Sequence, residues 1–350
     1  MSGFQTPNSR RPTSHYIYII LLGILLVLYL ISRTWSPASY GSMPARSPHE
    51  YEYSIVPGHF LQSLTATDPA TFNYTAENFG LITHEHYSNE GRQDSDDPDP
   101  DSSKAPWQRF ARFLRALPAT ATPGTTYKLI YLGRHGEGYH NVAEAFYGTK
   151  AWDEYWSKLD GNGTSVWSDA LLTPLGEDQA RHAADFMRTQ LSDAVRMPRP
   201  GMWVVSPLMR CLRTAELTWE SLWLDGGSKE TPVVREMVRE TLGEHTCDRR
   251  STRTVIAERV VEWEIEEGFA EQDELWEANH RETWAEHDVR TRSFLNELFA
   301  EEGGPDVVSV TAHSGTIASF LRVTGHRRFP LPTGGMMPIF VQAVRREETR

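Results

Sequence analysis

Residues 132–141 read Leu-Gly-Arg-His-Gly-Glu-Gly-Tyr-His-Asn, and they follow directly on the run Tyr127-Lys-Leu-Ile-Tyr131. A short apolar run of this kind, ended by glycine, is typical of a buried strand that enters a loop. The strand would place Arg134 and His135 at the carboxyl end of a sheet, where open α/β sheets bind ligands. The neighbouring glycines let the backbone approach a bound group, and Arg134 offers planar donors that suit phosphate. His135 is therefore a candidate nucleophile toward phosphorus.

Two further strand-like runs end in side chains of the same kind. Met202–Pro207 is followed by Arg210, which falls in the first turn of a predicted helix. Backbone N–H groups and the helix dipole favour an anion at such a position. Val307–Thr311 is followed by His313. The sequence therefore predicts two histidines and two phosphate-suited arginines at strand-to-helix junctions.

Four sequence elements occur together in a definite order and spacing. They are Arg134-His-Gly with Asn141 six residues after the histidine, Leu172-Thr-Pro-Leu-Gly-Glu-Asp-Gln-Ala180, Ser206-Pro-Leu-Met-Arg-Cys-Leu-Arg-Thr-Ala215 and His313-Ser-Gly315. In this combination the chain resembles the histidine phosphatase superfamily, whose best-known branch is the cofactor-dependent phosphoglycerate mutases. The segment Leu242–Ser251 is similar to a branch of small phosphatases found in fungi and plants. The resemblance extends from about Trp107 to Arg345, with residues 56–82 as a docked leader.

The resemblance implies a phosphoglycerate mutase-like α/β fold, a three-layer α/β/α sandwich with a mostly parallel central sheet. We expect this histidine phosphatase domain over residues 107–350, preceded by a polar tail, a membrane segment and a linker over residues 1–15, 16–32 and 33–106. Residues 88–104 of the linker contain five aspartates and are too acidic and apolar-poor to order themselves.

Two helical segments are predicted around the domain. Apolar spacing predicts an amphipathic helix at Trp107–Leu117. The stretch Glu258–Glu286 combines many acidic residues with three tryptophans, and we expect it to form a helical insertion rather than an acidic tail.

The resemblance also implies a role for each site residue. Attack by His135 on phosphorus would form a phosphohistidine, and this division into two steps lowers each barrier. Arg134, Arg210 and a protonated or hydrogen-bonding His313 would neutralise the charge on the phosphoryl oxygens. One ring nitrogen of His135 must carry no proton, so we expect a backbone acceptor to hold the other. The position in the family points to Glu240 as the acid that protonates the leaving group and later activates water.

Simpler roles compete with several of these assignments. Arg210 could cap or solvate its helix. Glu236 and Glu244 are alternatives to Glu240 as the proton donor. Asn141 could donate to phosphate or cap the helix that follows it. Four other histidines lack a comparable context and are expected to be structural or exposed: His140, His182, His245 and His326.

Three functions fit these residues. Residues 143–163 are rich in aromatic side chains but supply no obvious second phosphate site, which a mutase needs for its bisphosphorylated intermediate. Glu137-Gly138 also replaces the Glu-Ser or Gln-Ser pair of the family. We therefore favour a phosphomonoester hydrolase acting on a small phosphorylated substrate. The alternatives are a phosphoglycerate mutase-type transferase and a non-catalytic phosphate-binding protein, which would need no carboxylate in the pocket.

Composition argues against other classes of partner. The net charge of −12 makes nucleic acid an unfavourable ligand. Neither a dinucleotide-binding nor a P-loop glycine motif occurs, and no cysteine and histidine spacing typical of a metal site is present. Arginines beside the two signature histidines would oppose a bound cation. We expect no cofactor and no metal, and the sequence leaves the oligomeric state open.

An uncharged apolar run extends from Tyr16 to Ile31. Its length of sixteen residues is just below the range of about 17–25 that spans a bilayer. Ser32 and the tyrosines at either end can extend the run into the interface. We favour a signal anchor over residues 16–32, with a cleaved signal peptide and a secreted protein as the alternative.

The flanking charges suggest an orientation for this anchor. Basic residues near the run are slightly more numerous before it than after it, which predicts a cytoplasmic N-terminus and a lumenal or extracellular domain. Two glycosylation triplets, at Asn73 and Asn162, fit that location. Only two cysteines occur, Cys211 and Cys247, so no disulfide framework is implied.

This orientation predicts protection of the domain in sealed microsomes. An added protease should leave the domain intact until detergent opens the membrane, because the bilayer would separate the two. Immunoblotting of the domain before and after detergent measures this. Digestion within sealed vesicles would contradict the orientation.

Overall fold

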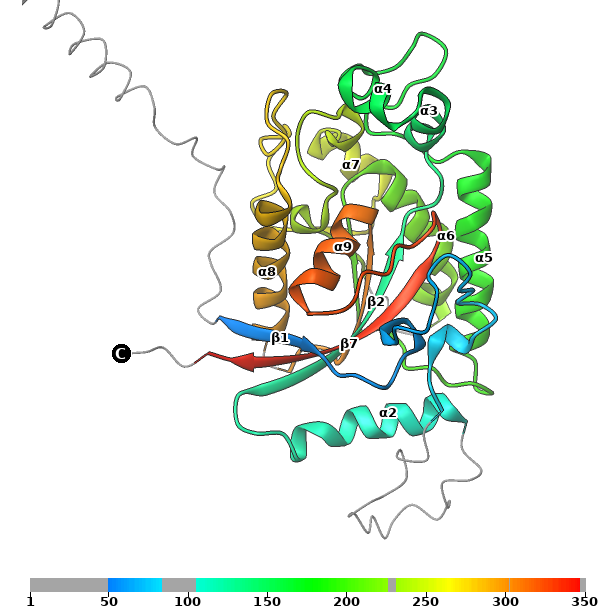
Figure 1. Cartoon of the computed structure of the whole chain (residues 1–350), viewed down its shortest axis with the longest axis vertical. Helices are drawn as coiled ribbons and strands as arrows, with labels where there is room; N and C mark the ends of the chain where they lie inside the picture. Colours follow the sequence, from blue (N-terminus) through cyan, green and yellow to red (C-terminus); the bar gives the residue numbers. More distant parts are fainter. Residues whose placement is uncertain (1–49, 84–104, 226–230, 302, 347–350) are drawn as a thin grey trace, which may run out of the picture. The chain divides into compact units, whose positions relative to one another are not determined.

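The computed structural model describes residues 50–83, 105–225, 231–301 and 303–346. Within these ranges a seven-stranded sheet has the order β1-β7-β2-β6-β3-β4-β5 (Figure 1). β7 runs antiparallel to its neighbours β1 and β2, and the other pairings are parallel. The strands are β1 Tyr51–Ile55, β2 Thr125–Arg134, β3 Met202–Val205, β4 Val233–Val234, β5 Glu264–Ile265, β6 Val307–Ala312 and β7 Met336–Arg345.

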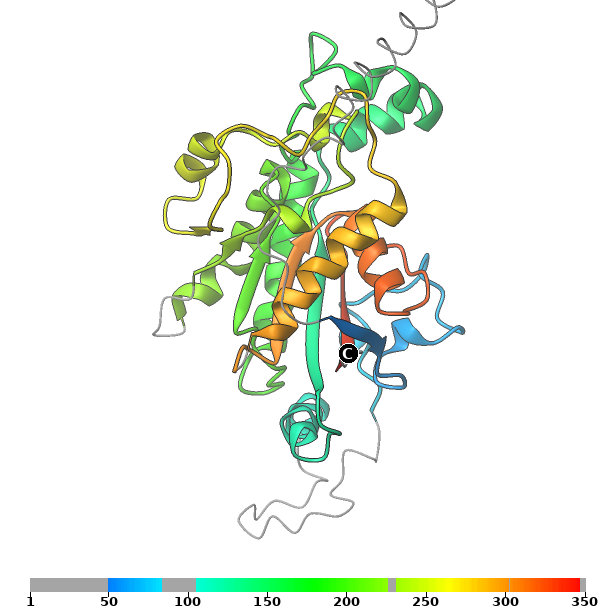
Figure 2. The same cartoon turned by 90° about the vertical axis from the view of Figure 1, so that its left-hand side faces the viewer.

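Helices cover both faces of the sheet (Figure 2). Because successive side chains of a strand point to opposite faces, each strand contributes to two cores. On β2, Leu129 and Tyr131 pack in a buried cluster with α5 (Pro174–Gln190) and α6 (Met209–Asp225). Ile130 and Leu132 pack in a second cluster with helices α8 (Trp284–Ala300) and α9 (Ser314–Val323). This mixed α/β arrangement of three layers agrees with the predicted fold class.

Shorter elements connect these layers. They are η1 Leu61–Ser63, η2 Asn78–Gly80, α2 Pro106–Ala116, η4 Leu117–Ala119, α3 Tyr139–Tyr147, α4 Thr149–Glu154, η5 Trp156–Lys158, η6 Glu236–Val238, η7 Thr246–Asp248 and α7 Arg253–Arg259. The predicted anchor at residues 16–32 and the acidic run at 88–104 lie outside the described residues. In the part of the chain that the structure covers, no helix is both long and apolar enough to cross a bilayer.

The segment before Trp107 belongs to the fold more fully than the predicted linker implies. β1 pairs with β7 at the edge of the sheet, and the Tyr53 hydroxyl donates to Asn296 Oδ1 on α8 at 2.7 Å. Within the expected leader at 56–82, Phe60 and Phe79 are buried in the same cluster as Trp107. The fold therefore includes residues well before Trp107, back to Glu50, whose backbone carbonyl accepts from Arg346 N at 2.8 Å.

The prediction of a helical insertion at Glu258–Glu286 was wrong. Beyond the end of α7 and before the start of α8, this stretch contains the short strand β5 and an irregular loop. The loop carbonyls bind a side chain instead of a helix backbone: the Arg250 guanidinium donates to the carbonyls of Ala270, Glu271 and Gln272. Carbonyls that bind Arg250 are not available for the backbone hydrogen bonds of a helix. The acidic composition of the stretch does not reveal this contact, because Arg250 lies outside it.

The loop after β2 is locked against the start of α5. The N-cap residue Thr173 donates its backbone N–H to Glu137 O at 2.8 Å, and the Gln179 side chain accepts from Glu137 N at 2.8 Å. A Cβ on Gly136 would lie 2.2 Å from Gly176 O, and a Cβ on Gly176 would lie 2.1 Å from Glu137 O. Glycine at both positions is what allows the two backbones to touch.

The substitution Gly176→Ala should therefore destabilise the fold by about 1–3 kcal/mol, because the added methyl meets backbone that cannot move freely. Urea denaturation measures the change in the free energy of unfolding. Gly133→Ala is the matched control, since its Cβ would make only ordinary contacts, the nearest at 3.6 Å to Met336. Equal stability of the two variants would contradict the close approach.

Candidate active site

The structure brings the two signature histidines together. β2 and β6 are adjacent parallel strands, and Arg134 pairs in register with Ala312, so His135 and His313 follow at the same sheet edge. Their ring centroids are 5.1 Å apart. Arg210 arrives from the second residue of α6, beside the neighbouring strand β3. The adjacency of parallel strand ends, which the sequence pattern predicted, thus creates the cluster.

His135 is held in a state suited to nucleophilic attack. It is only 2% exposed, and its Nδ1 lies 2.7 Å from the carbonyl oxygen of Gly136. A carbonyl can only accept, so Nδ1 carries the proton and Nε2 keeps its lone pair. Burial and then the charges of Arg210 and Arg134 lower the pKa of His135 well below its usual range. The imidazole is therefore neutral at neutral pH.

Each of the two arginines keeps a buried donor without a protein partner. Arg134 donates from Nη1 to Leu331 O at 2.8 Å. Arg210 donates to Cys247 O at 2.6 Å and to Asp248 Oδ1 at 2.9 Å. In both guanidinium groups the Nε is buried and has no hydrogen-bond partner among the described residues. Because an unpaired buried donor is costly, these two groups point to an anionic ligand.

His313 is fully buried beside His135. Its Nε2 lies 2.7 Å from Ser206 Oγ, and the Cys211 thiol lies 3.4 Å from the same nitrogen. Burial and the nearby charge of Arg210 lower the pKa of His313 well below its usual range. Of the two forms expected from the sequence, the neutral hydrogen-bonding form is therefore the favoured one.

Glu240 reaches the start of α9, next to His313. Its Oε2 accepts from Gly315 N at 3.0 Å and from Ser314 Oγ at 3.3 Å. Its Oε1 accepts from Thr241 N at 2.8 Å. A Cβ on Gly315 would lie 2.0 Å from Glu240 Oε1, so glycine is required for this approach. A carboxylate placed at a helix N-terminus is also stabilised by the helix dipole.

The two competing glutamates are engaged elsewhere. Glu236 is paired with Arg239 at 2.9 Å and with Arg250 at 2.5 Å. Glu244 forms an ion pair with Lys158 at 3.6 Å. Because Glu236 and Glu244 bind these partners, Glu240 is the one of the three glutamates that lies beside the histidine cluster.

Asn141 is the third residue of α3, and its side chain binds the backbone of the N-cap residue Gly138. Its Oδ1 accepts from Gly138 N at 2.9 Å. Its Nδ2 forms no hydrogen bond with the residues that the structure describes. The two roles considered for Asn141 are therefore compatible, because the oxygen caps the helix while the amide nitrogen can donate to a ligand.

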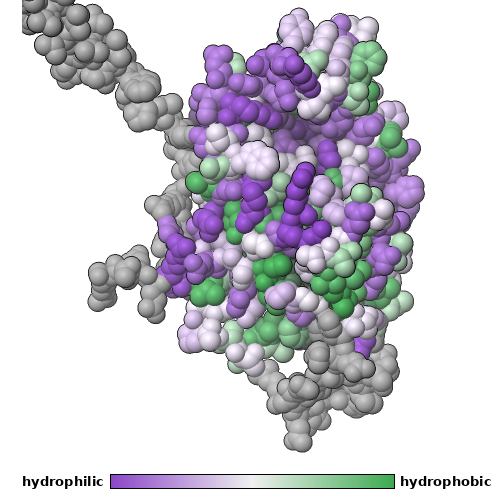
Figure 3. Space-filling view, viewed as in Figure 1, coloured by the Kyte–Doolittle hydropathy of each residue, from purple (hydrophilic) through white to green (hydrophobic). Residues whose placement is uncertain are grey.

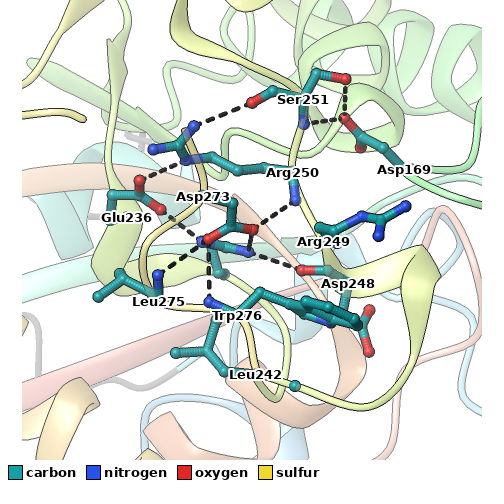
Figure 4. Close-up of polar contacts among 12 residues, drawn as sticks. Asp169, Glu236, Leu242, Asp248, Arg249, Arg250, Ser251, Asp273, Leu275 and Trp276 are labelled. Atoms are coloured by element: carbon teal, nitrogen blue, oxygen red, sulfur yellow. Dashed lines mark hydrogen bonds and ion pairs between the residues drawn. The ribbon is translucent and has the colours of Figure 1, made fainter. Parts of the chain in front are cut away.

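A buried ion network surrounds Arg210, and Figure 4 shows the part of it that includes Asp248, Asp273 and Arg250. Asp248 pairs with Arg210 through one carboxylate oxygen and with Arg281 through the other, at 2.9 and 2.8 Å. Arg239 donates to the Asp248 carbonyl and forms two hydrogen bonds with Asp273. The irregular loop that carries Asp273 is thus connected through three charged side chains to Arg210.

One group of side chains has the spacing of a metal site among the described residues. Ligand atoms of His245, Cys247 and Asp248 lie within 4.8 Å of one another. Both oxygens of Asp248 are already bound to guanidinium groups, and burial raises the pKa of the Cys247 thiol well above its usual value. These donors do not fit a cation, and the absence of a metal stays a prediction.

Two contributions to the site were missed from the sequence. Thr214 accepts from Gly136 N at 3.0 Å and so holds the loop that carries His135. Its place in the Ser206–Ala215 element was the available signal. His140, expected to be structural or exposed, is buried at 8% exposure, with its ring centroid 5.3 Å from that of His135. Only its position five residues after His135 could have suggested this.

The face seen in Figure 3 is mostly hydrophilic around α3 and α4, whereas hydrophobic residues gather in its lower half. The two lysines near these helices are paired with carboxylates: Lys150 with Glu154 at 3.9 Å and Lys158 with Glu244 at 3.6 Å.

Comparison with known proteins gives a consistent result. The model of the histidine phosphatase superfamily (branch 1) matches residues 130–332. A probable phosphoglycerate mutase of Arthroderma benhamiae is 45% identical over 83% of this chain and 84% of that protein. A probable phosphoglycerate mutase of Saccharomyces cerevisiae is 36% identical over 67% and 85%. A phosphoglycerate mutase-like protein of Arabidopsis thaliana is 28% identical over 57% and 75%. The resemblance predicted from the motifs is confirmed.

The buried network yields a prediction on acid stability. Although burial alone would raise it, Arg239 and Arg250 lower the pKa of Asp273 below its usual value. The stabilisation from Asp273 is therefore present above about pH 4, the usual carboxyl pKa, and is lost as pH falls through the lower pKa of the folded state. Asp273→Asn should destabilise the fold by about 1–3 kcal/mol at pH 7, because the buried Arg239 loses one of its two carboxylate partners and keeps only Glu236.

Denaturant unfolding at several pH values measures the difference in unfolding free energy between the wild type and the variant. This difference should shrink below about pH 4, as the wild-type carboxylate takes up a proton. Asp193→Asn serves as the control, since Asp193 is exposed and its ion pair with Arg196 is long, at 4.0 Å. A loss for Asp273→Asn that equals the control would rule out a supporting role for the network.

Proposed function

The chain belongs to the histidine phosphatase superfamily (branch 1), and we propose that it hydrolyses phosphate monoesters through a phosphohistidine on His135. The observation that carries this proposal is the state of His135: a buried neutral imidazole, fixed at Nδ1 by a carbonyl, beside two arginines with unpaired buried donors. A nucleophile and an anion pocket are the two parts that phosphoryl transfer requires.

In the first step, the Nε2 lone pair of His135 attacks phosphorus while the bond from phosphorus to the ester oxygen breaks. Arg134, Arg210 and His313 would stabilise the charge on the non-bridging oxygens. The leaving oxygen takes the proton of the Glu240 carboxylic acid and departs as an alcohol. The products of this step are the alcohol, the Glu240 carboxylate and the phosphohistidine.

In the second step, water attacks the phosphohistidine and the bond from phosphorus to nitrogen breaks. The Glu240 carboxylate removes a proton from the water, which restores the acid for the next cycle. His135 returns to its neutral form with the proton still on Nδ1. The contacts of Glu240 with Gly315 N and Ser314 Oγ support this role, because they place its carboxylate beside the loop that carries His313.

A mutase is the second candidate, and it is favoured by the names of the fungal relatives. A mutase would transfer the phosphoryl group to a second hydroxyl and would depend on a bisphosphate primer. We favour the hydrolase because residues 143–163 supply no obvious second phosphate site. A non-catalytic binding protein is less favoured, because binding alone does not require a carboxylate at the position of Glu240.

We also propose that residues 16–32 anchor the protein in a membrane of the secretory pathway, with Asn73 and Asn162 as glycosylation sites. Both asparagines are exposed, which glycosylation requires. In each case the side-chain oxygen accepts from the backbone N–H two residues later, at 3.0 Å.

The full-length protein should release phosphate from p-nitrophenyl phosphate in the presence of EDTA, and His135→Ala should abolish this release. Glu240→Gln should slow hydrolysis of an alkyl phosphate by about 10²–10⁴-fold. The effect on p-nitrophenyl phosphate should be smaller, because nitrophenolate departs without help from an acid. Phosphate release measured for each variant tests both expectations.

His182→Ala is the control, since His182 is exposed on α5 and belongs to none of the four signature elements. Retention of hydrolysis by His135→Ala would refute the phosphohistidine mechanism. If no ester is hydrolysed but a bisphosphate labels His135, the mutase is the correct function.

A further inference from the structure

His140 has no part in the mechanism above, yet it is buried beside the nucleophile. It lies in the first turn of α3 and is 8% exposed. Its Nδ1 is buried and has no hydrogen-bond partner in the described ranges. A buried imidazole nitrogen without a partner is unfavourable, because it has lost its hydrogen bonds to water and gained none in the protein. A residue needed only for packing at this position would gain from being apolar.

The ring of His140 lies beside the proposed nucleophile His135. The centroid of His140 lies 5.3 Å from that of His135, close to the 5.1 Å between His135 and His313. Burial and the charges of Arg210, His135 and Arg134 lower the pKa of His140 well below its usual range. His140 is thus a neutral imidazole, with one donor and one acceptor, within the influence of both pocket arginines.

Gly138 is shaped to receive this ring. A Cβ at Gly138 would lie 2.7 Å from His140 Nδ1 and 3.3 Å from Leu171 O. Any larger residue at Gly138, such as the serine of the family pattern, would therefore displace the imidazole. Glycine at 138 and histidine at 140 form a matched pair, in which the missing side chain of one makes room for the polar ring of the other.

We propose that His140 is a further phosphate-binding residue, which donates a hydrogen bond to a non-bridging oxygen of the phosphoryl group held at His135. The inference rests on the proposed function only in that a phosphoryl group occupies the pocket. A phosphate oxygen would satisfy the polar ring that the protein leaves without a partner.

The probe is orthovanadate, a phosphate analogue, titrated into the full-length protein. His140→Phe keeps a ring of similar size but removes the donor, and it should weaken vanadate binding by about tenfold or more. His140→Gln keeps a donor and should recover much of the affinity. The matched control is His326→Phe, since His326 is also 8% exposed but bonds the carbonyl of Arg327. Its affinity for vanadate should equal that of the wild type.

A second measurement does not depend on the folding of His140→Phe. In wild-type protein labelled with ¹⁵N-histidine, vanadate should shift the His140 ring resonances, which are assigned by their absence from His140→Gln. The His326 resonances should stay in place. Unchanged His140 resonances at saturating vanadate, or equal vanadate affinity of folded His140→Phe and wild type, would overturn the proposal.

These outcomes separate the inference from the function on which it rests. If the wild type binds vanadate through His140 but hydrolyses no ester, the proposed hydrolase fails and the phosphate ligand stands. If the wild type hydrolyses esters and His140→Phe has unchanged kcat/KM and vanadate affinity, the hydrolase stands and His140 is a packing residue.

Discussion

The guanidinium of Arg210 is almost sealed from solvent, at 1% exposure. A buried charge is stable only where an opposite charge and hydrogen bonds replace the lost water. Here Asp248 supplies the charge and the Cys247 carbonyl a further acceptor. Asp248 is held in turn by Arg281, and the surrounding loop is fixed through Arg239. Asp273 of the irregular segment between α7 and α8 contributes to this network through its two hydrogen bonds with Arg239.

Arg210 also affects the protonation of its neighbours. Burial is the larger cause of the lowered pKa of His135, His140 and His313, and the charge of Arg210 adds to it. His135 is held with its proton on Nδ1, the nitrogen that faces a carbonyl. In the proposed reaction, burial and this one positive charge would together favour the neutral nucleophile, and the same charge would attract the substrate anion.

Much of this site could be predicted from the sequence, because parallel strands end at one sheet edge. That rule brought His135 and His313 together through β2 and β6. The choice of Glu240 over Glu236 needed the structure, because it depends on which carboxylate the distant Arg239 and Arg250 engage. The loop at 258–286 and the edge strand β1 were missed for a similar reason. The residues that these two segments contact lie far away in the sequence, so the local pattern of apolar and polar residues does not predict the contacts.

The backbone contact between Arg346 N and Glu50 O has a consequence for the architecture of the chain. It holds the first and last described residues together beside the start of β2, at the opposite end of that strand from Arg134. Adjacent ends at a surface permit circular permutation and insertion into another protein. New termini could therefore be opened elsewhere in the domain while Glu50 and Arg346 are joined by a short linker, at a point remote from the histidine cluster along β2.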